Sequence, residues 1–280
     1  MPDTSREEFA AAVSRPEEEI DLAEASLLIA RMEYPGLDVR SYLARLDGMA
    51  DAIRARLPRG SRAGRITREM NRYLFEECGL RGNEQDYYNP CNSFLNDVLD
   101  RKLGIPITLA IVYMEIGRRL GVRLDGISFP GHFLVKLRQA DGDWILDPFH
   151  QGAVLDEDTL QKQVDEALTP GLVPEEQSQK WLVTADKREI LARLLRNLKA
   201  IYLHGGDVER ALNAVDRILL VTPDAPGELR DRGLLYDKMQ HRRAALADYA
   251  RYLELVPDAE DAAEIRERVA VLRETIETIN

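Results

Sequence analysis

The sequence predicts an α+β protein in two parts: a mainly helical N-terminal domain that holds a small antiparallel sheet, and an all-helical C-terminal domain of repeated helix pairs. Three observations support this fold class. Apolar residues recur at helical spacing through the first hundred residues, three short alternating segments follow, and the last third of the 280 residues contains an internal repeat. We expect the two domains to span residues 1–180 and 181–280.

Helices are predicted in the first hundred residues because helix formers with helically spaced apolar residues lie between breaking residues. These helices cover Asp21–Arg31, Val39–Leu57, Ile66–Glu77 and Ser93–Leu103. We expect Ser93 to cap the last of them. The next segment, Thr108–Leu120, is apolar on most sides, which is typical of a buried central helix that follows a turn at Pro106.

Three short strands should follow the central helix, and their alternation places two polar residues together. The predicted strands are Leu124–Phe129, Phe133–Leu137 and Trp144–Leu146. A two-residue turn at Asp141-Gly142 would set Ala140 opposite Asp143. In that register His132 and Asp147 lie on one face of the sheet as diagonal neighbours, within reach of a hydrogen bond.

The C-terminal third repeats with a period of 34 residues, which is the tetratricopeptide period. The matched pairs are Tyr202 and Tyr236, Ala211 and Ala245, and Pro223 and Pro257. Core positions are assigned to Leu198, Val215 and Ile218 in the first copy and to Gly233, Tyr249 and Tyr252 in the second. Lys199 and Arg232 stand where glycine and leucine are usual, and a plain helical bundle is the alternative.

The composition excludes several classes of protein. Hydrophobic residues make up 45% of the chain and the formal net charge is −11, which argues against disorder and against non-specific nucleic-acid binding. The longest apolar run, Ile105–Met114, is too short to cross a membrane, and the N-terminus lacks a signal-peptide core. Two cysteines give no disulfide framework. We therefore expect a cytoplasmic protein that binds neither nucleic acid nor membranes.

One segment departs from the acidic balance. Residues 54–72 contain a single acid, Glu69, beside seven arginines: Arg54, Arg56, Arg59, Arg62, Arg65, Arg68 and Arg72. The run is either a solvated face or a basic docking patch for an acidic partner. It follows no predicted strand and lacks the Gly-Lys-Ser/Thr ending of a phosphate-binding loop, so no nucleotide site is expected.

The chemistry candidates centre on His132 and Asp147, because a carboxylate can fix the tautomer of an imidazole and support its cationic form. Two members of a Cys-His-Asp constellation are thus present. Cys91 starts the preceding helix and Cys78 ends an earlier one, and each is either a nucleophile or a plain buried thiol. The other histidines considered, His204 and His241, are expected at the surface. No zinc-binding motif occurs, so we expect no metal and no cofactor.

Four segments of the sequence resemble the bacterial SirB family, which joins a transglutaminase-like domain to tetratricopeptide-type repeats. They are Asn92–Asn96, Gly104–Leu109, Phe129–Val135 and Ile145–Phe149. The resemblance implies a papain-like fold with a Cys-His-Asp triad, in which His132 and Asp147 take the histidine and aspartate positions. The same resemblance puts Pro106 at the cysteine position, and proline has no nucleophilic side chain.

Two functions follow as hypotheses. The favoured one is a non-catalytic scaffold that binds a protein or peptide through the repeats or through a groove near His132. The alternative is a cysteine-dependent acyl transferase or protease acting on a protein amide, with Cys91 as nucleophile, His132 as proton shuttle and Asp147 as its orienter. Within the first hypothesis, the His132–Asp147 pair is either functional or purely structural.

Overall fold

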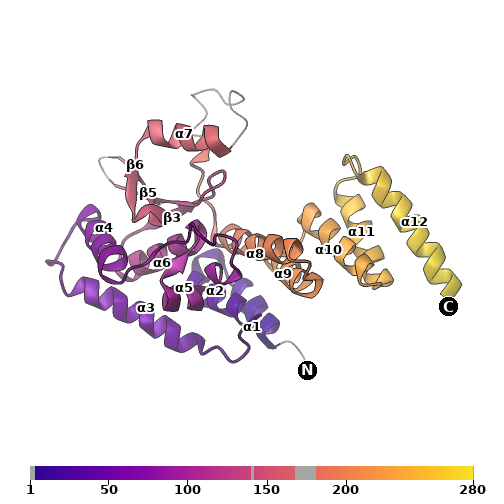
Figure 1. Ribbon diagram of the computed structural model, residues 1–280, viewed down its shortest axis with the longest axis horizontal. Coiled ribbons are helices and arrows are strands. Elements are labelled where there is room, and N and C mark those ends of the chain that lie inside the picture. Colours follow the sequence, from indigo (N-terminus) through magenta and orange to yellow (C-terminus); the bar gives the residue numbers. More distant parts are fainter. Residues whose placement is uncertain (1–3, 140–141, 168–180, 280) are drawn as a thin grey trace. The chain divides into compact units, whose positions relative to one another are not determined.

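The computed structural model describes residues 4–139, 142–167 and 181–279, and it forms two compact units, Met1–Ile190 and Leu191–Asn280. The α+β fold class is confirmed: helices predominate, and a small antiparallel sheet lies in the first unit (Figure 1). The domain boundary expected at 180/181 adjoins residues outside the described ranges and stays a prediction. Across the described ranges, no helix combines the length and hydropathy that a membrane span needs.

Aspartates cap three helices of the first unit: Asp21, Asp38 and Asp156 each accept hydrogen bonds from free amides of the helix that follows. The helices of this unit are α1 (Thr4–Val13), α2 (Leu22–Ala30), α3 (Val39–Arg54), α4 (Ala63–Asn71), α5 (Leu95–Arg101), α6 (Pro106–Arg119) and α7 (Glu157–Ala167). Short turns of other helix types are η1 (Glu17–Glu19), the π-helical η2 (Arg72–Glu77), η3 (Pro90–Asn92) and η4 (Pro148–His150). The expected cap at Ser93 is wrong, because Ser93 closes η3 and its buried hydroxyl has no hydrogen-bond partner.

Helix α6 is the centre of the first unit, as the sequence predicts. Every residue from Pro106 to Gly117 is buried. Pro106 is the first residue of the helix rather than part of a preceding turn, a position where its missing N–H costs no intrahelical hydrogen bond.

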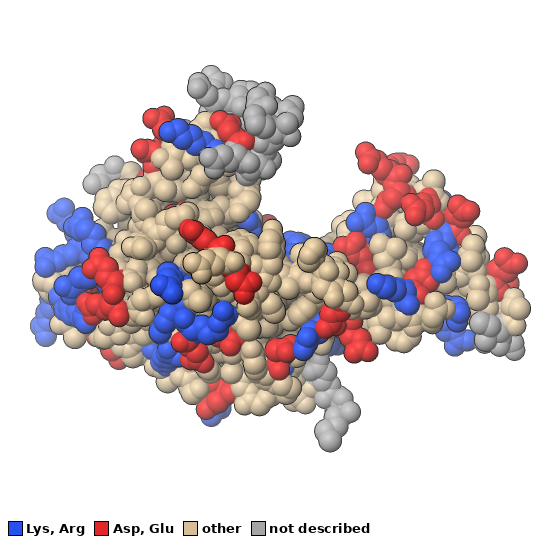
Figure 2. Space-filling view, viewed as in Figure 1, with Lys and Arg blue, Asp and Glu red and all other residues tan. Residues whose placement is uncertain are grey.

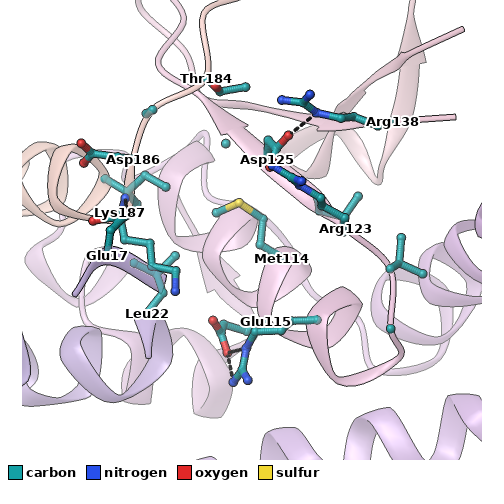
Figure 3. Close-up of a pocket in the computed structure, with 17 residues that line it drawn as sticks. Glu17, Leu22, Met114, Glu115, Arg123, Asp125, Arg138, Thr184, Asp186 and Lys187 are labelled. Carbon is teal, nitrogen blue, oxygen red and sulfur yellow. Dashed lines mark hydrogen bonds and ion pairs between the residues drawn. The ribbon is translucent and has the colours of Figure 1, made fainter. Parts of the chain in front are cut away.

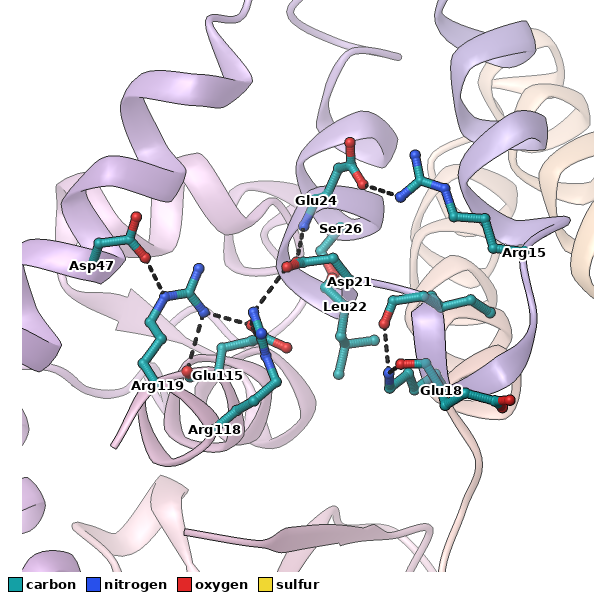
Figure 4. Close-up of polar contacts among 12 residues, drawn as sticks. Arg15, Glu18, Asp21, Leu22, Glu24, Ser26, Asp47, Glu115, Arg118 and Arg119 are labelled. Atoms are coloured by element: carbon teal, nitrogen blue, oxygen red, sulfur yellow. Dashed lines mark hydrogen bonds and ion pairs between the residues drawn. The ribbon is translucent and has the colours of Figure 1, made fainter. Parts of the chain in front are cut away.

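A buried acid ties the far end of α6 to its neighbours (Figure 4). The Glu115 side chain is 4% exposed and accepts hydrogen bonds from Arg118 at 2.8 Å and from Arg119 at 2.6 Å. Arg119 also donates to Asp47 on α3 at 2.7 Å, and Arg118 donates to Asp21 at the start of α2 at 2.8 Å. Since the buried charge is paired twice, the network links three helices without an uncompensated charge.

The sheet has the order β3-β4-β5-β6, and every neighbouring pair is antiparallel. Its strands are β3 (Leu124–Ile127), β4 (Leu134–Leu137), β5 (Trp144–Asp147) and β6 (Ala153–Leu155). The three predicted strands are therefore present, and β6 adds a fourth. A separate parallel pair joins β1 (Arg81–Gly82) to β2 (Leu103–Gly104) just before α6.

The register between β4 and β5 differs from the predicted one. Leu137 lies opposite Trp144, whereas the expected two-residue turn would set it opposite Leu146. The observed pairing centres the connection one residue earlier in the chain, on residues 140–141, which lie outside the described ranges. Because the shift is two residues, an even number, side chains keep the faces that the sequence predicts.

Helices pack on both faces of the sheet, with α7 on one side and α6 on the other (Figure 1). Leu160 and Val164 of α7 form a buried cluster with Ile127, Leu134 and Ile145 of the sheet. Both faces of this small sheet are thereby removed from water, which is the main stabilising term for such a layer.

The second unit follows the predicted repeat of helix pairs. Its helices are α8 (Lys187–His204, which begins in the first unit), α9 (Val208–Val221), α10 (Pro226–Lys238), α11 (Arg242–Leu255) and α12 (Ala262–Ile279). All six predicted core positions are buried: Leu198, Val215, Ile218, Gly233, Tyr249 and Tyr252. A Cβ atom at Gly233 would lie 2.6 Å from the Tyr249 ring, so the close approach of α10 and α11 requires glycine there.

The two atypical repeat positions hold ion pairs. Lys199 donates to Glu228 at 2.7 Å and to Asp231 at 2.8 Å. Arg232 donates to both carboxylate oxygens of Asp248, each at 2.7 Å. Charged pairs thus replace the usual glycine and leucine at these positions without leaving a charge unpaired.

Candidate functional site

Asp147 is the centre of the candidate site. It ends β5, and its side chain is fully buried. Oδ1 accepts hydrogen bonds from the backbone N–H groups of Phe149 at 3.0 Å and His150 at 3.3 Å, and so caps the turn η4. An aspartate followed by proline suits this position, because the carboxylate binds the amides that the turn leaves free.

The predicted contact between His132 and Asp147 is confirmed. Nε2 of His132 lies 2.8 Å from Oδ2 of Asp147, and 14% of the histidine side chain is exposed. His132 lies in the turn between β3 and β4, where its amide donates to the carbonyl of Phe129 at 3.2 Å. Gly131 in that turn has a φ of +65°, which glycine adopts without strain and which brings His132 back toward the end of β5.

A second imidazole shares the same carboxylate, and the sequence analysis did not identify it. Nδ1 of His150 lies 2.7 Å from Oδ2 of Asp147, and the side chain is 54% exposed. The centroids of the His132 and His150 rings are 5.9 Å apart. The signal in the sequence was the spacing Asp147-x-x-His150, since a 3₁₀ turn brings residues three apart onto one side. His204 and His241 are exposed, as predicted.

Asp147 remains ionised between the two imidazoles. Burial by itself would raise the pKa of its carboxyl, but the hydrogen bonds and charges of His132 and His150 outweigh burial and lower the pKa below its ordinary value. A carboxylate in this state can orient both rings through its hydrogen bonds.

Helices α4 and α6 hold the turn that carries Asp147 and His150. The buried Tyr113 on α6 donates to Oδ1 of Asn71 at 2.6 Å, and Asn71 donates to the carbonyl of Gly152 at 3.0 Å. Gly152 has a φ of +72°, and a Cβ atom there would lie 2.3 Å from the Asn71 side chain. Glycine is therefore required at this end of the turn.

His132, Asp147 and His150 also offer one metal-binding atom each within 4.8 Å of one another. Two imidazole nitrogens and a carboxylate oxygen are donors that transition metals accept. In the structure, Oδ2 of Asp147 is hydrogen-bonded to both rings, so these contacts already account for the arrangement. The expected absence of a metal stays a prediction.

Hydrogen bonds occupy the polar side chain at the start of α6, where the resemblance places a cysteine. Pro106, which the resemblance puts at the cysteine position, is buried. The Thr108 hydroxyl, the nearest one along the chain, is fully buried. It accepts from the Ile105 amide at 3.0 Å and lies 2.8 Å from the carbonyl of Asn92, to which it donates. Its role is to cap the helix.

The Cys91 thiol, proposed as a nucleophile, belongs to a different cluster. Burial raises the pKa of Cys91, the negative charge of Asp97 raises it further, and the neighbouring Tyr34 hydroxyl offsets only part of the rise. Tyr34 in turn donates to Asp97 at 2.7 Å. The side chains that act most strongly on the pKa of this thiol are Asp97, Tyr34 and Arg101, none of which is an imidazole. Cys78 follows η2 and lies close enough to Tyr73 and Lys102 to affect the pKa values of both.

A cavity of the first unit lies elsewhere. It measures about 590 Å³ and is bounded by the end of α6, by β3 and by residues 184–187 (Figure 3). Charged groups of both signs line it, among them Glu17, Asp125, Arg138 and Lys187. Neither His132 nor Asp147 is among its lining residues, so a groove beside His132 remains a proposal.

Comparison with protein families separates the chain into two matched parts. Residues 40–196 match the transglutaminase-like superfamily, and residues 198–270 match the tetratricopeptide repeat. Among solved structures, a crystal structure of menin is similar with a TM-score of 0.42 and 14% identity, covering 95% of this chain and 73% of menin.

Comparison with individual proteins finds bacterial relatives along most of the chain. A UPF0162 protein of Xylella fastidiosa is 41% identical over 251 residues, which is 89% of each chain. A UPF0162 protein of Vibrio cholerae is 34% identical over 69% of this chain and 70% of its own. Protein SirB1 of Salmonella typhimurium is 29% identical over 63% of this chain and 64% of its own. With both domains matched in their observed order, this chain belongs to the transglutaminase-like, repeat-containing family of SirB1 and UPF0162 proteins.

Proposed function

We propose that this chain is a non-catalytic interaction scaffold of the cytoplasm, in which a transglutaminase-like domain has no nucleophile and the repeats bind a protein or peptide partner. The observation that carries the proposal is the start of α6, where Pro106 is buried and the hydroxyl of Thr108 is bonded on both sides. The repeats support the partner role, because stacked helix pairs form extended surfaces that proteins commonly use for binding other proteins.

Two exposed apolar surfaces are candidates for the partner contact. In the repeats, Leu203 and Leu234 are 44% and 50% exposed. In the first domain, Tyr88 is 77% exposed and packs edge-on against Tyr87, which contacts Phe149 beside His132. Exposed aromatic and aliphatic side chains are the groups that anchor most protein interfaces.

We expect the Leu203→Ser/Leu234→Ser variant to lose bound partner in affinity capture with the full chain, while Tyr88→Ser retains it. The physical reason is that each leucine would remove apolar surface from water in the complex. A matched control is Val183→Ser, which alters another exposed aliphatic residue, 69% exposed, outside the repeats. Loss of the partner by Tyr88→Ser alone would assign binding to the first domain instead, and equal capture by every variant would contradict a repeat-mediated scaffold.

The alternative, cysteine-dependent acyl transfer by Cys91 with His132 and Asp147, makes an opposite prediction about the thiol. Because its raised pKa disfavours the thiolate, Cys91 in a Cys78→Ser background should react with iodoacetamide at pH 6 more slowly than the same chain unfolded. His132→Ala should leave that rate unchanged. Fast alkylation that depends on His132 would restore the enzyme hypothesis and contradict the scaffold.

A further inference from the structure

A second cavity of the first unit is lined by an unusual concentration of positive charge. It measures about 480 Å³ and lies where the start of α4 meets the ends of β4 and β5. Six of its lining residues carry the argument: Arg59, Arg62, Arg65, Arg68, Gln139 and Trp144. Figure 2 shows Lys and Arg side chains gathered over the part of the surface where Figure 1 places α4.

The structure divides the arginine run of residues 54–72 into two groups. Three arginines form ion pairs: Arg54 with Asp51, Arg56 with Glu77 at 2.6 Å, and Arg72 with Glu69 at 2.6 Å. The four arginines of the cavity are exposed, and no acid of the described ranges lies within ion-pair distance of any of them. The first group thus fits the interpretation as a solvated face. The second group lines one cavity.

Four unpaired guanidinium groups around one cavity repel one another, and the repulsion falls when an anion lies between them. This is unusual in a chain whose net charge is −11, where acidic partners are abundant. Arg62, Arg65 and Arg68 follow one another at intervals of three along α4 and its cap, so they share a helix face. Arg59 joins them from the preceding loop, which turns at Gly60 with a φ of +74°.

The opposite wall of the cavity is built by close packing on the first turn of α4. A Cβ atom at Gly64 would lie 3.1 Å from both the Gln139 and the Trp144 side chains, so glycine lets them sit directly on the helix. The Nε2 atom of Gln139 is buried and has no hydrogen-bond partner among the residues that the structure describes. Since an unpaired buried donor is costly, an acceptor on a ligand in this cavity would stabilise the wall.

We propose that this cavity binds a small phosphate-bearing anion, held by the guanidinium groups of Arg59, Arg62, Arg65 and Arg68. Guanidinium forks match the oxygen geometry of phosphate and give two parallel hydrogen bonds each. The volume suits a compact ligand rather than an extended acidic peptide. The site uses side-chain charge in place of the backbone amides of a glycine-rich phosphate loop, whose sequence pattern is absent here. The proposed anion site does not depend on the proposed scaffold function.

The test measures pyrophosphate binding to the full chain by calorimetry at constant ionic strength. Wild type should bind with saturation, and Arg59→Gln/Arg65→Gln should bind at least about tenfold more weakly, because charge-assisted hydrogen bonds are lost. The control Arg40→Gln/Arg123→Gln changes the net charge equally at exposed arginines outside the cavity and should stay within about twofold of wild type. Circular dichroism establishes that both variants are folded.

Two further ligands test whether the cavity prefers a small phosphate-bearing molecule or a peptide. A phosphoserine peptide and a peptide of Asp and Glu are titrated in the same way, and pyrophosphate should bind more tightly than either. Tighter binding of a peptide would overturn the assignment to a small molecule. Absence of saturable binding, or equal affinities for the two double variants, would overturn the site itself.

Discussion

Asp147→Ala should lower the free energy of unfolding by about 3 kcal/mol or more, because it removes the buried partner of several hydrogen-bonded groups. The backbone amides of Phe149 and His150 and the ring of His132 would all lose their acceptor. Chemical denaturation followed by circular dichroism measures the change. Asp143→Ala is the matched control, since Asp143 is an exposed aspartate just before the same strand.

The stabilisation by Asp147 should also depend on pH in a defined direction. Its pKa is lowered in the folded chain, so its contribution is complete above the ordinary aspartate pKa of about 3.9 and disappears as the pH falls through the lower folded value. The difference between wild type and Asp147→Ala should therefore shrink in acid. Equal stability of Asp147→Ala and Asp143→Ala at neutral pH would show that the carboxylate does not hold the site together.

Arg232→Leu should destabilise the repeats by about 3 kcal/mol, although leucine is the usual residue at this repeat position. Arg232 forms a two-pronged contact with Asp248 and donates to Asp216 at 2.9 Å. Asp248 is only 6% exposed, so losing the arginine leaves its charge buried without compensation. The loss is read from the thermal unfolding transition of the full chain.

The double variant Arg232→Leu/Asp248→Leu separates the charge effect from simple packing. Replacing both members of a buried ion pair by apolar residues is often neutral, so we expect most of the lost stability to return. A double variant as unstable as Arg232→Leu would mean that the position requires arginine for a reason other than its pairing with Asp248.

The contact between His132 and Asp147 was predictable because strand alternation has a period of two. The pairing differs from the predicted register by two residues, yet this even shift left both side chains on the expected face. His150 escaped prediction because its approach to Asp147 depends on η4, on the cap that Asp147 gives this turn, and on the positive φ of Gly152. These are tertiary features, held by Asn71 and Tyr113 from distant helices.

The interaction partners of the charged groups and of the thiol likewise come from residues far away in the sequence. Arg56 pairs most closely with Glu77 on η2, at 2.6 Å and 21 residues further along the chain, and only at 3.5 Å with Glu69. Cys91 was expected at the start of the helix that became α5, but it lies in the separate turn η3, beside Asp97 of α5 and Tyr34 from the connection after α2. Local spacing contains no information on either contact.

By itself, the sequence determined the fold class, the central buried helix, and the repeat with its core residues. These features follow from periodicity and residue type, which are local properties of the chain. Only the tertiary structure decided that Asp147 serves two imidazoles, that Thr108 is occupied as a cap, and that four arginines of one run surround a cavity without acidic partners. The reason is that ion pairing and burial depend on contacts between segments that are distant in the sequence. Local sequence patterns do not specify those contacts.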